Sequence, residues 1–566
     1  MTAGAVRHGC SASALAALWV VMFAGTGACG AETGLKMAAG TGLPPISAEG
    51  RVLLETWSRE IALTAAPGQF ESAIITLSAD VGLKGIRVEA GDLAGPAGAV
   101  IPGSKIRLHR VRSRGAKARG SKKIVVYPEF LFPLRGDIDL KKGEPGFVWV
   151  TVSVPKDAAA GEYAGELSVI CRGTSQRVKL GLRVLPFKPV KPKIVLAMLY
   201  SYEFRYLERY EADYEPAGKR RPRSGREGFL KRGRRAVRDM AEHGMNTIFP
   251  HSSAVVIERG GKPYLPDVYA SMDAARAEGM DFTPGWVVGW LTHAQWKDIP
   301  KFNEKKDVAM LKRISVEAAR AARERGFKEV IITPSDEPNH ERKLPVARKL
   351  LAGAGRIGGV RWAITGLAPT LKTLSDLYDI GIIAGGTPED WAELKRRGKE
   401  LWIYDNNATS GRDPVWSRFV YGLLGWRAGF DGVTSWTYPP DIGDYRGGRT
   451  DARDGSKIAT YTPEGEPVTT VIWEAIRDGI TDRRYIDTLE AEIKRAKSGG
   501  FRRRRAAARA QKVLDGLWER VDPNLKSHDW KHTEYGSPRP KGFDWQGLEK
   551  ARAEVVAAIL KLKGLR

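Results

Sequence analysis

Residues 328–340 read KEVIITPSDEPNH, and the interpretation of the whole chain starts from this stretch. Its apolar, β-branched centre from Val330 to Ile332 predicts a short buried strand. The strand runs into two adjacent carboxylates, Asp336 and Glu337, and stops at Pro338. Asp-Glu-Pro is also ordinary loop sequence, so the meaning of the pair depends on where this strand lies in the fold.

On both sides of this stretch, short β-branched segments alternate with amphipathic helical segments. Eight such pairs occupy residues 194–496, which predicts a (β/α)8 barrel, the TIM barrel fold. Functional residues of such barrels lie at the carboxyl ends of the strands, and Asp336 and Glu337 follow the fourth strand. The predicted strands are residues 194–200, 245–249, 282–288, 329–333, 361–365, 380–384, 400–404 and 432–438.

The residues that follow the other predicted strands are rich in aromatic rings, amides and carboxylates. Aromatic faces stack on the C–H faces of sugars and polar groups bind hydroxyls, so this rim predicts a saccharide ligand. A purely structural role is the alternative for Glu203, as the solvated start of a helix, and for His251 and the two tryptophans of strand three, as rim packing. The candidates for substrate contact are Glu203, His251, Trp286, Trp290, Tyr404, Asn406, Trp436 and Tyr438.

The adjacency of the two carboxylates restricts the chemistry of this rim. Neighbours on one chain cannot flank a scissile bond from opposite sides, as the usual glycosidase pair does at roughly 5–10 Å. They suit a substrate that supplies its own nucleophile, the 2-acetamido oxygen of an N-acetylhexosamine. Asp336 would orient the acetamido N–H and stabilise the oxazolinium, and Glu337 would act as acid and then as base. Two close carboxylates raise one pKa, which we expect to keep Glu337 protonated near neutrality.

Two regions of different character flank the predicted barrel. Residues 45–187 contain many short alternating segments separated by Gly, Pro, Asp and Ser, which predicts a β-sandwich. Residues 185–193, LPFKPVKPK, space three prolines three apart and predict a stiff joint between domains. Residues 501–566 contain two helical segments with apolar stripes, which predicts a helical C-terminal extension packed on the barrel.

The first 31 residues have the pattern of a signal peptide. Residues 14–25, ALAALWVVMFAG, are too short to span a bilayer and are followed by small residues. Cleavage near Ala31 predicts an exported protein, periplasmic or extracellular, and a lipid anchor at Cys29 is the alternative. The remaining chain has one cysteine, Cys171, so no disulfide is expected within it. It also has no uninterrupted apolar run of about 18 residues, so no membrane span is expected.

The net charge of +25 makes a polyanion a candidate partner. The excess lies in residues 107–123, 219–238 and 502–505, where aromatic residues are almost absent. Because no nucleic-acid-binding motif accompanies these runs, specific nucleic-acid binding is not expected, whereas contact with an acidic matrix or sulfated glycan stays open. No cluster of His, Asp or Glu has metal-ligand spacing, so we expect neither a metal nor a cofactor.

Several motifs carry a resemblance to a known family. They include Ser335-Asp336-Glu337-Pro338, the segments VTVSVP (150–155) and AGEYAGELSV (160–169), Trp402-Ile403-Tyr404, Arg418, Trp426, GFDG (429–432), Trp436, Trp473-Glu474 and RDGI (477–480). Together, over residues 145–490, they resemble glycoside hydrolase family 123 and related bacterial proteins that share its C-terminal barrel half.

The resemblance implies a β-sandwich followed by a barrel and a retaining, substrate-assisted β-N-acetylgalactosaminidase. It implies Asp336 as the acetamido stabiliser, Glu337 as the acid and base, and Tyr404 as a hydroxyl that hydrogen-bonds the acetamido oxygen. Strand eight, residues 434–438, departs from the family pattern, which leaves a galacto or gluco preference open.

The sequence as a whole therefore predicts an exported, hexosaminidase-like glycoside hydrolase acting on glycans. A catalytically silent, surface carbohydrate-binding protein on the same scaffold is the alternative. The presence of both Asp336 and Glu337 favours the enzyme, because a protein that only binds sugar has no need of an acid and base.

Overall fold

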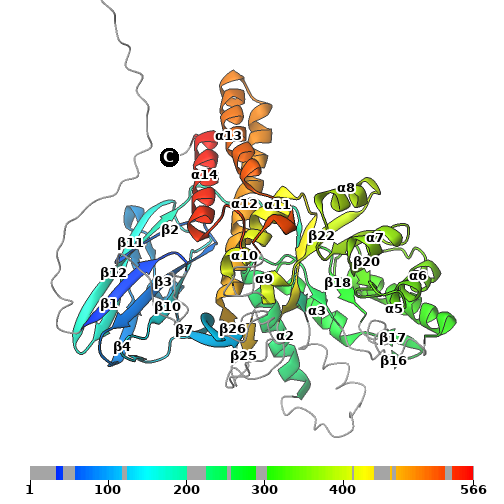
Figure 1. Cartoon of the computed structure of the whole chain (residues 1–566), viewed down its shortest axis with the longest axis horizontal. Helices are drawn as coiled ribbons and strands as arrows, with labels where there is room; N and C mark the ends of the chain where they lie inside the picture. The colour runs from blue at the N-terminus through cyan, green and yellow to red at the C-terminus, as the bar shows by residue number, and fades with distance from the viewer. Residues whose placement is uncertain are drawn as a thin grey trace, which may run out of the picture.

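The computed structural model describes residues 34–42, 58–117, 124–200, 225–251, 257–288, 302–410, 413–438, 459–461, 467–529 and 538–564. They form a sheet-rich N-terminal region, a parallel sheet with helices, and a group of C-terminal helices (Figure 1). The predicted signal peptide and Cys29 lie outside these ranges. None of the helices within the described ranges is long and apolar enough to cross a bilayer.

Two sheets make up the N-terminal region. In the first, the order is β1 (Leu35–Gly40), β3 (Phe70–Ala79), β10 (Gly146–Ser153), β7 (Ile106–Lys117), β8 (Ile124–Pro133), β26 (Pro467–Thr470) and β25 (Ala459–Tyr461). In the second it is β2 (Glu60–Ala65), β12 (Thr174–Val184), β11 (Gly161–Cys171), β4 (Leu83–Ala90) and β9 (Ile138–Leu140), with β5 (Leu93–Ala94) and β6 (Val100–Ile101) alongside.

Alternating side chains hold these two sheets together. Strand β12 buries every second residue, among them Val178, Leu180 and Leu182, which pack against Ile75 and Val150 of the first sheet's core strands. The strands here extend beyond the predicted boundaries of 45–187. Strand β1 begins before residue 45, and β26 is added to the edge of β8 from far along the chain, where it covers otherwise unpaired backbone groups.

The predicted parallel strands form a half-barrel sheet. Its order is β13 (Val195–Leu196), β23 (Gly432–Thr434), β22 (Glu400–Tyr404), β21 (Ile380–Ile383), β20 (Val360–Gly366), β19 (Val330–Thr333) and β18 (Gly285–Val287). A second sheet contains β15 (Phe249–Pro250), β14 (Leu199–Tyr200) and β24 (Trp436–Tyr438). The Gly285 amide donates to the Ile248 carbonyl at 2.9 Å, which connects β18 to the segment of β15. The complete eight-stranded barrel stays a prediction.

Helices follow most of these strands. They are α2 (Gly225–Glu242), α3 (Pro266–Ala277), α5 (Glu304–Glu324), α6 (Lys343–Ala354), α7 (Ala368–Thr373), α8 (Pro388–Arg396), α10 (Pro414–Phe419) and α11 (Gly425–Arg427). The Thr387-Pro388 pair is a favourable helix start, and at the beginning of α8 Thr387 and Asp390 form a reciprocal capping box. A small hairpin, β16 (Ile257–Arg259) and β17 (Lys262–Tyr264), and the short helix α9 (Asn407–Ser410) were not predicted.

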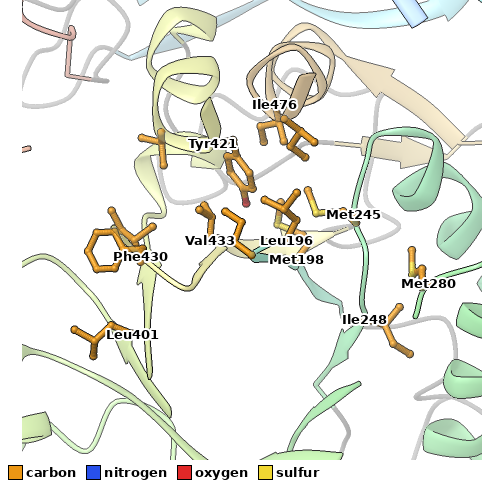
Figure 2. Packing of buried hydrophobic residues seen from close by; sticks show 14 of the residues in the cluster. Leu196, Met198, Met245, Ile248, Met280, Leu401, Tyr421, Phe430, Val433 and Ile476 are labelled. Carbon is orange, nitrogen blue, oxygen red and sulfur yellow. The ribbon is translucent and has the colours of Figure 1, made fainter. Parts of the chain in front are cut away.

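The strands of the half-barrel separate two apolar layers. In β19, Ile331 belongs to the cluster inside the half-barrel, whereas Val330 and Ile332 belong to the cluster between sheet and helices. Figure 2 shows that outer layer, where Leu196 and Val433 of the strands meet Tyr421 and Ile476 from the helical side.

Two glycines make room for the large rings that fill the inside of the half-barrel. A Cβ on Gly285 would lie 1.8 Å from the Phe249 ring, and one on Gly432 would lie 2.5 Å from the Trp402 ring. Phe249 and Trp402 meet edge to face at 5.8 Å. Both rings belong to the apolar cluster inside the half-barrel, together with Ile331.

Helices α13 (Phe501–Arg520) and α14 (Trp545–Lys563) lie in the predicted C-terminal extension, and they pack against α12 (Val471–Lys497), which lies within the predicted barrel range. A buried ion cluster, defined as Glu71, Arg418, Asp482 and Arg552, joins them to the first sheet and to α10. The Arg552 guanidinium pairs with Glu71 of β3 at 2.9 Å and also with Asp482 of α12. Sheet, barrel segment and C-terminal helices therefore share one charged junction.

Candidate active site

The two adjacent carboxylates lie directly after β19, as predicted. Asp336 forms an isolated parallel bridge with Thr365 of β20, which extends the β19–β20 pairing beyond Thr333. Glu337 has φ of 45°, in the left-handed region that non-glycine residues rarely adopt. Such strain costs roughly 1–3 kcal/mol and is characteristic of functional sites. The turn at Glu337 breaks the strand alternation that would otherwise send neighbouring side chains to opposite faces.

The electrostatics of the pair are set largely by the burial of Asp336. Burial and then the neighbouring Glu337 raise the pKa of Asp336 to about 6, whereas Lys343 and a hydrogen bond with Thr365 oppose the shift. This upward shift of the Asp336 pKa was not predicted from the sequence. The physical reason is the environment of Asp336, which the sequence neighbours do not reveal.

Tyr404 and Asn406, at the end of β22, lie close to this pair. Burial raises the pKa of the Tyr404 phenol, and Asp336 and Glu337 raise it further, so the hydroxyl stays protonated as a hydrogen-bond donor. Asn406 is hydrogen-bonded to Tyr404, and its Oδ1 accepts from the Trp436 backbone N–H at 3.0 Å. Asn406 thereby ties the ends of β22 and β24 together.

Trp436 and His251 pack together beside these strand ends. Their rings meet edge to face at 5.4 Å with an interplanar angle of 86°. His251 is bridged to Val287 of β18, and Trp436 packs against the inner apolar cluster that contains Tyr404. The structure thus brings together six sequence-predicted residues from four strand ends: Asp336, Glu337, Tyr404, Asn406, Trp436 and His251.

Two predicted contact residues lie on the other side of the sheet. Trp286 is 1% exposed and belongs to the outer apolar layer, because Val287 is the residue of β18 that faces inward. Tyr438 is fully buried in the same layer, and its hydroxyl donates to Asp239 of α2 at 2.7 Å. These positions correct the prediction for both residues, since neither ring can meet a sugar from there.

The reason for the position of Tyr438 is a register shift. Leu199 pairs with Trp436 and Tyr200 with Tyr438, so one residue of β24 is inserted between two residues of β14. The bulge turns Tyr438 to the face opposite Trp436, although period-two alternation predicts the same face. Glu203 and Trp290 lie outside the described residues, and their assignments stay predictions.

Sequence reasoning missed two residues of the site, Thr365 and Lys343. Thr365 ends the fifth predicted strand, so the rule that strand ends carry function could have identified it. Lys343 is 5% exposed at the first position of α6, and its positive charge acts on both Asp336 and Glu337. Within the described ranges, no group of three or more His, Cys, Asp or Glu side chains is placed to hold a metal.

Comparison with solved structures gives a match over almost the whole chain. A family 123 glycoside hydrolase from Clostridium perfringens, studied for glycolipid glycan hydrolysis, superposes with a TM-score of 0.65. The match covers 94% of this chain and 98% of that chain at 11% sequence identity. This chain has the fold of that family 123 enzyme. The predicted resemblance is confirmed at the level of the fold.

Other solved structures superpose with lower TM-scores. An exo β-N-acetylglucosaminidase of family 20 from Vibrio harveyi is 9% identical, with 81% of this chain and 98% of that chain covered and a TM-score of 0.27. A family 53 catalytic domain from Ignisphaera aggregans is 14% identical, with 51% and 98% covered and a TM-score of 0.30. No family model and no curated protein matches the sequence.

Proposed function

We propose that this chain is a retaining glycoside hydrolase that cleaves β-N-acetylhexosaminides, and β-N-acetylgalactosaminides in particular, with the substrate's acetamido group as nucleophile. One observation carries the proposal: Asp336 and Glu337 are neighbours after one strand, and both act electrostatically on the Tyr404 hydroxyl. Neighbouring residues cannot provide two carboxylates on opposite sides of the scissile bond, as the ordinary mechanisms require. The fold shared with a family 123 hydrolase supports the same class.

In the proposed first step, protonated Glu337 donates its proton to the glycosidic oxygen while the acetamido oxygen attacks C1. The C1–O bond breaks, the alcohol leaves, and a cyclic oxazolinium forms. The Asp336 carboxylate accepts a hydrogen bond from the acetamido N–H and balances the new positive charge. The Tyr404 hydroxyl donates a hydrogen bond to the acetamido oxygen. In the second step, the Glu337 carboxylate removes a proton from water, whose oxygen attacks C1 from the side of the departed alcohol. The bond between C1 and the acetamido oxygen breaks as the new C1–O bond forms, which restores the acetamido group.

We further propose that the chain has the domain organisation expected from its sequence. A complete (β/α)8 barrel over residues 194–496 would carry the site, after a β-sandwich over residues 45–187 and before a helical extension over residues 501–566. We also propose, from the signal-like pattern of the first 31 residues, that the glycan substrate lies outside the cytoplasm. Trp436 and His251 would line the sugar, and Asn406 would hold both Trp436 and Tyr404 in position.

Hydrolysis of aryl β-N-acetylgalactosaminide and aryl β-N-acetylglucosaminide tests this function, and release of the aryl alcohol is the measurement. We expect cleavage of at least one substrate, with the β-anomer of the free sugar appearing first in the NMR spectrum. The matched aryl β-galactoside, which lacks the acetamido group, should resist cleavage. An inverted product excludes the substrate-assisted mechanism, and sugar binding without turnover of any substrate favours the silent binding protein.

The pKa of Asp336 predicts how activity depends on pH. Because Asp336 must be ionised to stabilise the oxazolinium, the acid limb of the kcat/KM profile should fall tenfold per pH unit below the Asp336 pKa of about 6. Thr365→Val removes a hydrogen bond that lowers this pKa, so the acid limb should move to higher pH. Thr373→Val, whose hydroxyl bonds only the nearby Pro369 carbonyl, is the control and should leave the limb in place. An unmoved limb in Thr365→Val would contradict the assignment.

A further inference from the structure

The turn between α12 and α13 carries a surface that the hydrolase proposal does not use. We define the hairpin tip as residues 494–505, KRAKSGGFRRRR, where α12 ends at Lys497 and α13 begins at Phe501. Figure 1 shows that the α12–α13 hairpin projects upward, away from the sheets, and that its upper end is an extremity of the molecule.

The third C-terminal helix covers the base of this hairpin but not its tip. Helix α14 ends at Lys563, whose ammonium pairs with Glu492 of α12 at 2.9 Å. Glu492 precedes the tip, so the described residues of α14 stop short of it. Lys494 and Lys497 of the tip also line a hollow with Gln511 and Trp518 of α13.

The hairpin tip is strongly basic. Its seven cations are all exposed, and the stretch contains no carboxylate that could neutralise them: Lys494, Arg495, Lys497, Arg502, Arg503, Arg504 and Arg505. Arg495 pairs with Glu492 just outside the stretch, at 3.0 Å. Arg504 donates to the Gly499 carbonyl at 3.0 Å, which closes the turn without reducing the charge.

An aromatic ring lies among these cations. Phe501 is 72% exposed, compared with 42% for Trp518 further along the same helix. Further along α13, Ala507, Ala510, Leu514 and Leu517 are buried against the neighbouring helices. An aromatic ring exposed to water is unfavourable. At a lipid–water interface, in contrast, the ring can enter the boundary of the apolar layer while neighbouring arginines bind anionic headgroups.

We propose that the hairpin tip docks the protein on an anionic phospholipid surface, with the arginines on the headgroups and Phe501 in the interface. A free polyanion satisfies the cations equally well but leaves the Phe501 ring in water, so the exposed ring favours lipid. The proposal is independent of hydrolase activity. It concerns contact with a membrane surface, not a membrane span.

Vesicle sedimentation of the full chain tests this docking. We expect binding to vesicles of phosphatidylcholine with phosphatidylglycerol, release by salt, and no binding to phosphatidylcholine alone. A variant with Arg502→Gln, Arg503→Gln, Arg504→Gln and Arg505→Gln keeps good helix formers at these positions. Its partition coefficient should fall roughly 25-fold if two of the four arginines contact lipid at once, at about fivefold each. Phe501→Ser should weaken binding separately.

Four exposed cations of the N-terminal sheets serve as a matched control. A variant with Lys84→Gln, Arg87→Gln, Lys141→Gln and Lys142→Gln loses the same charge away from the tip and should bind like the wild type. Equal losses in both quadruple variants would show a nonspecific charge effect and overturn the proposal. So would a Phe501→Ser variant that binds vesicles like the wild type while the arginine variant loses heparin binding, since that pattern assigns the tip to a free polyanion.

Discussion

Glu337→Gln is expected to lower kcat by about 10²–10⁴-fold on N-acetylhexosaminides with poor leaving groups. The glutamine amide keeps the size of the side chain but can neither donate a proton to the glycosidic oxygen nor accept one from water. On aryl substrates whose leaving alcohol is a strong acid, the first step needs little protonation, so the loss in that step should be much smaller. Single-turnover kinetics on a series of aryl leaving groups measures this difference.

Two companion variants make the measurement specific. Asp336→Asn should lower the rate for good and poor leaving groups alike, because both pass through the same oxazolinium. Glu341→Gln is the matched control, an exposed glutamate four residues after Glu337 that should retain wild-type rates. A Glu337→Gln loss that does not depend on the leaving group would refute the role of Glu337 as acid.

Arg552→Met is expected to cost about 3–5 kcal/mol of unfolding free energy, because it removes the buried cation that pairs with Glu71 and leaves Asp482 with Arg418 alone. The Arg552 side chain is 6% exposed, and the paired side chains of Glu71 and Asp482 are 7% and 5% exposed. Methionine fills part of the same volume, so the expected loss reports mainly on the uncompensated charges. Urea unfolding followed by tryptophan fluorescence measures the change in midpoint.

Arg520→Met is the matched control for this prediction. Arg520 of α13 pairs with Glu554 of α14 at 2.6 Å, with side chains 42% and 36% exposed. Such an exposed pair contributes about 0–1 kcal/mol, so its loss should barely move the midpoint. Adding Glu71→Gln to Arg552→Met should recover part of the stability, because burial raises the pKa of Glu71 to about 8 and glutamine removes a carboxyl that is costly to ionise there. Equal destabilisation by Arg552→Met and Arg520→Met would show that burial of the cluster does not matter.

Local sequence patterns predicted the elements of this chain well, because strands and helices follow from residue-level preferences. The β-branched run before Asp336 is strand β19, and the Thr387-Pro388 start of α8 carries the expected cap. Strand-end logic also selected Tyr404, Asn406, Trp436 and His251, which the structure brings near the two carboxylates. Each of these inferences needs only the chain neighbours of a residue.

The sequence did not predict the features that depend on contacts between distant parts of the chain. Strand β26 joins the N-terminal sheet across more than 300 positions of sequence, and no local signal indicates that pairing. The ion cluster that unites Glu71 with Arg552 is equally non-local. Lys343 is a loop-to-helix lysine of ordinary appearance, and only its burial near Asp336 identifies it as part of the site.

The sequence by itself determined that Asp336 and Glu337 end a buried strand side by side, because apolar runs and proline act through local backbone preferences. Only the tertiary structure decided what surrounds them. Pairing across β19 and β20 sets Thr365 beside Asp336, and burial there raises the pKa of Asp336 rather than leaving it ordinary. A bulge in β24 sends Tyr438 to the outer layer, while Trp436 packs at the inner cluster. Registers and burial arise from packing between strands, so a one-residue shift changes which side chains reach the site.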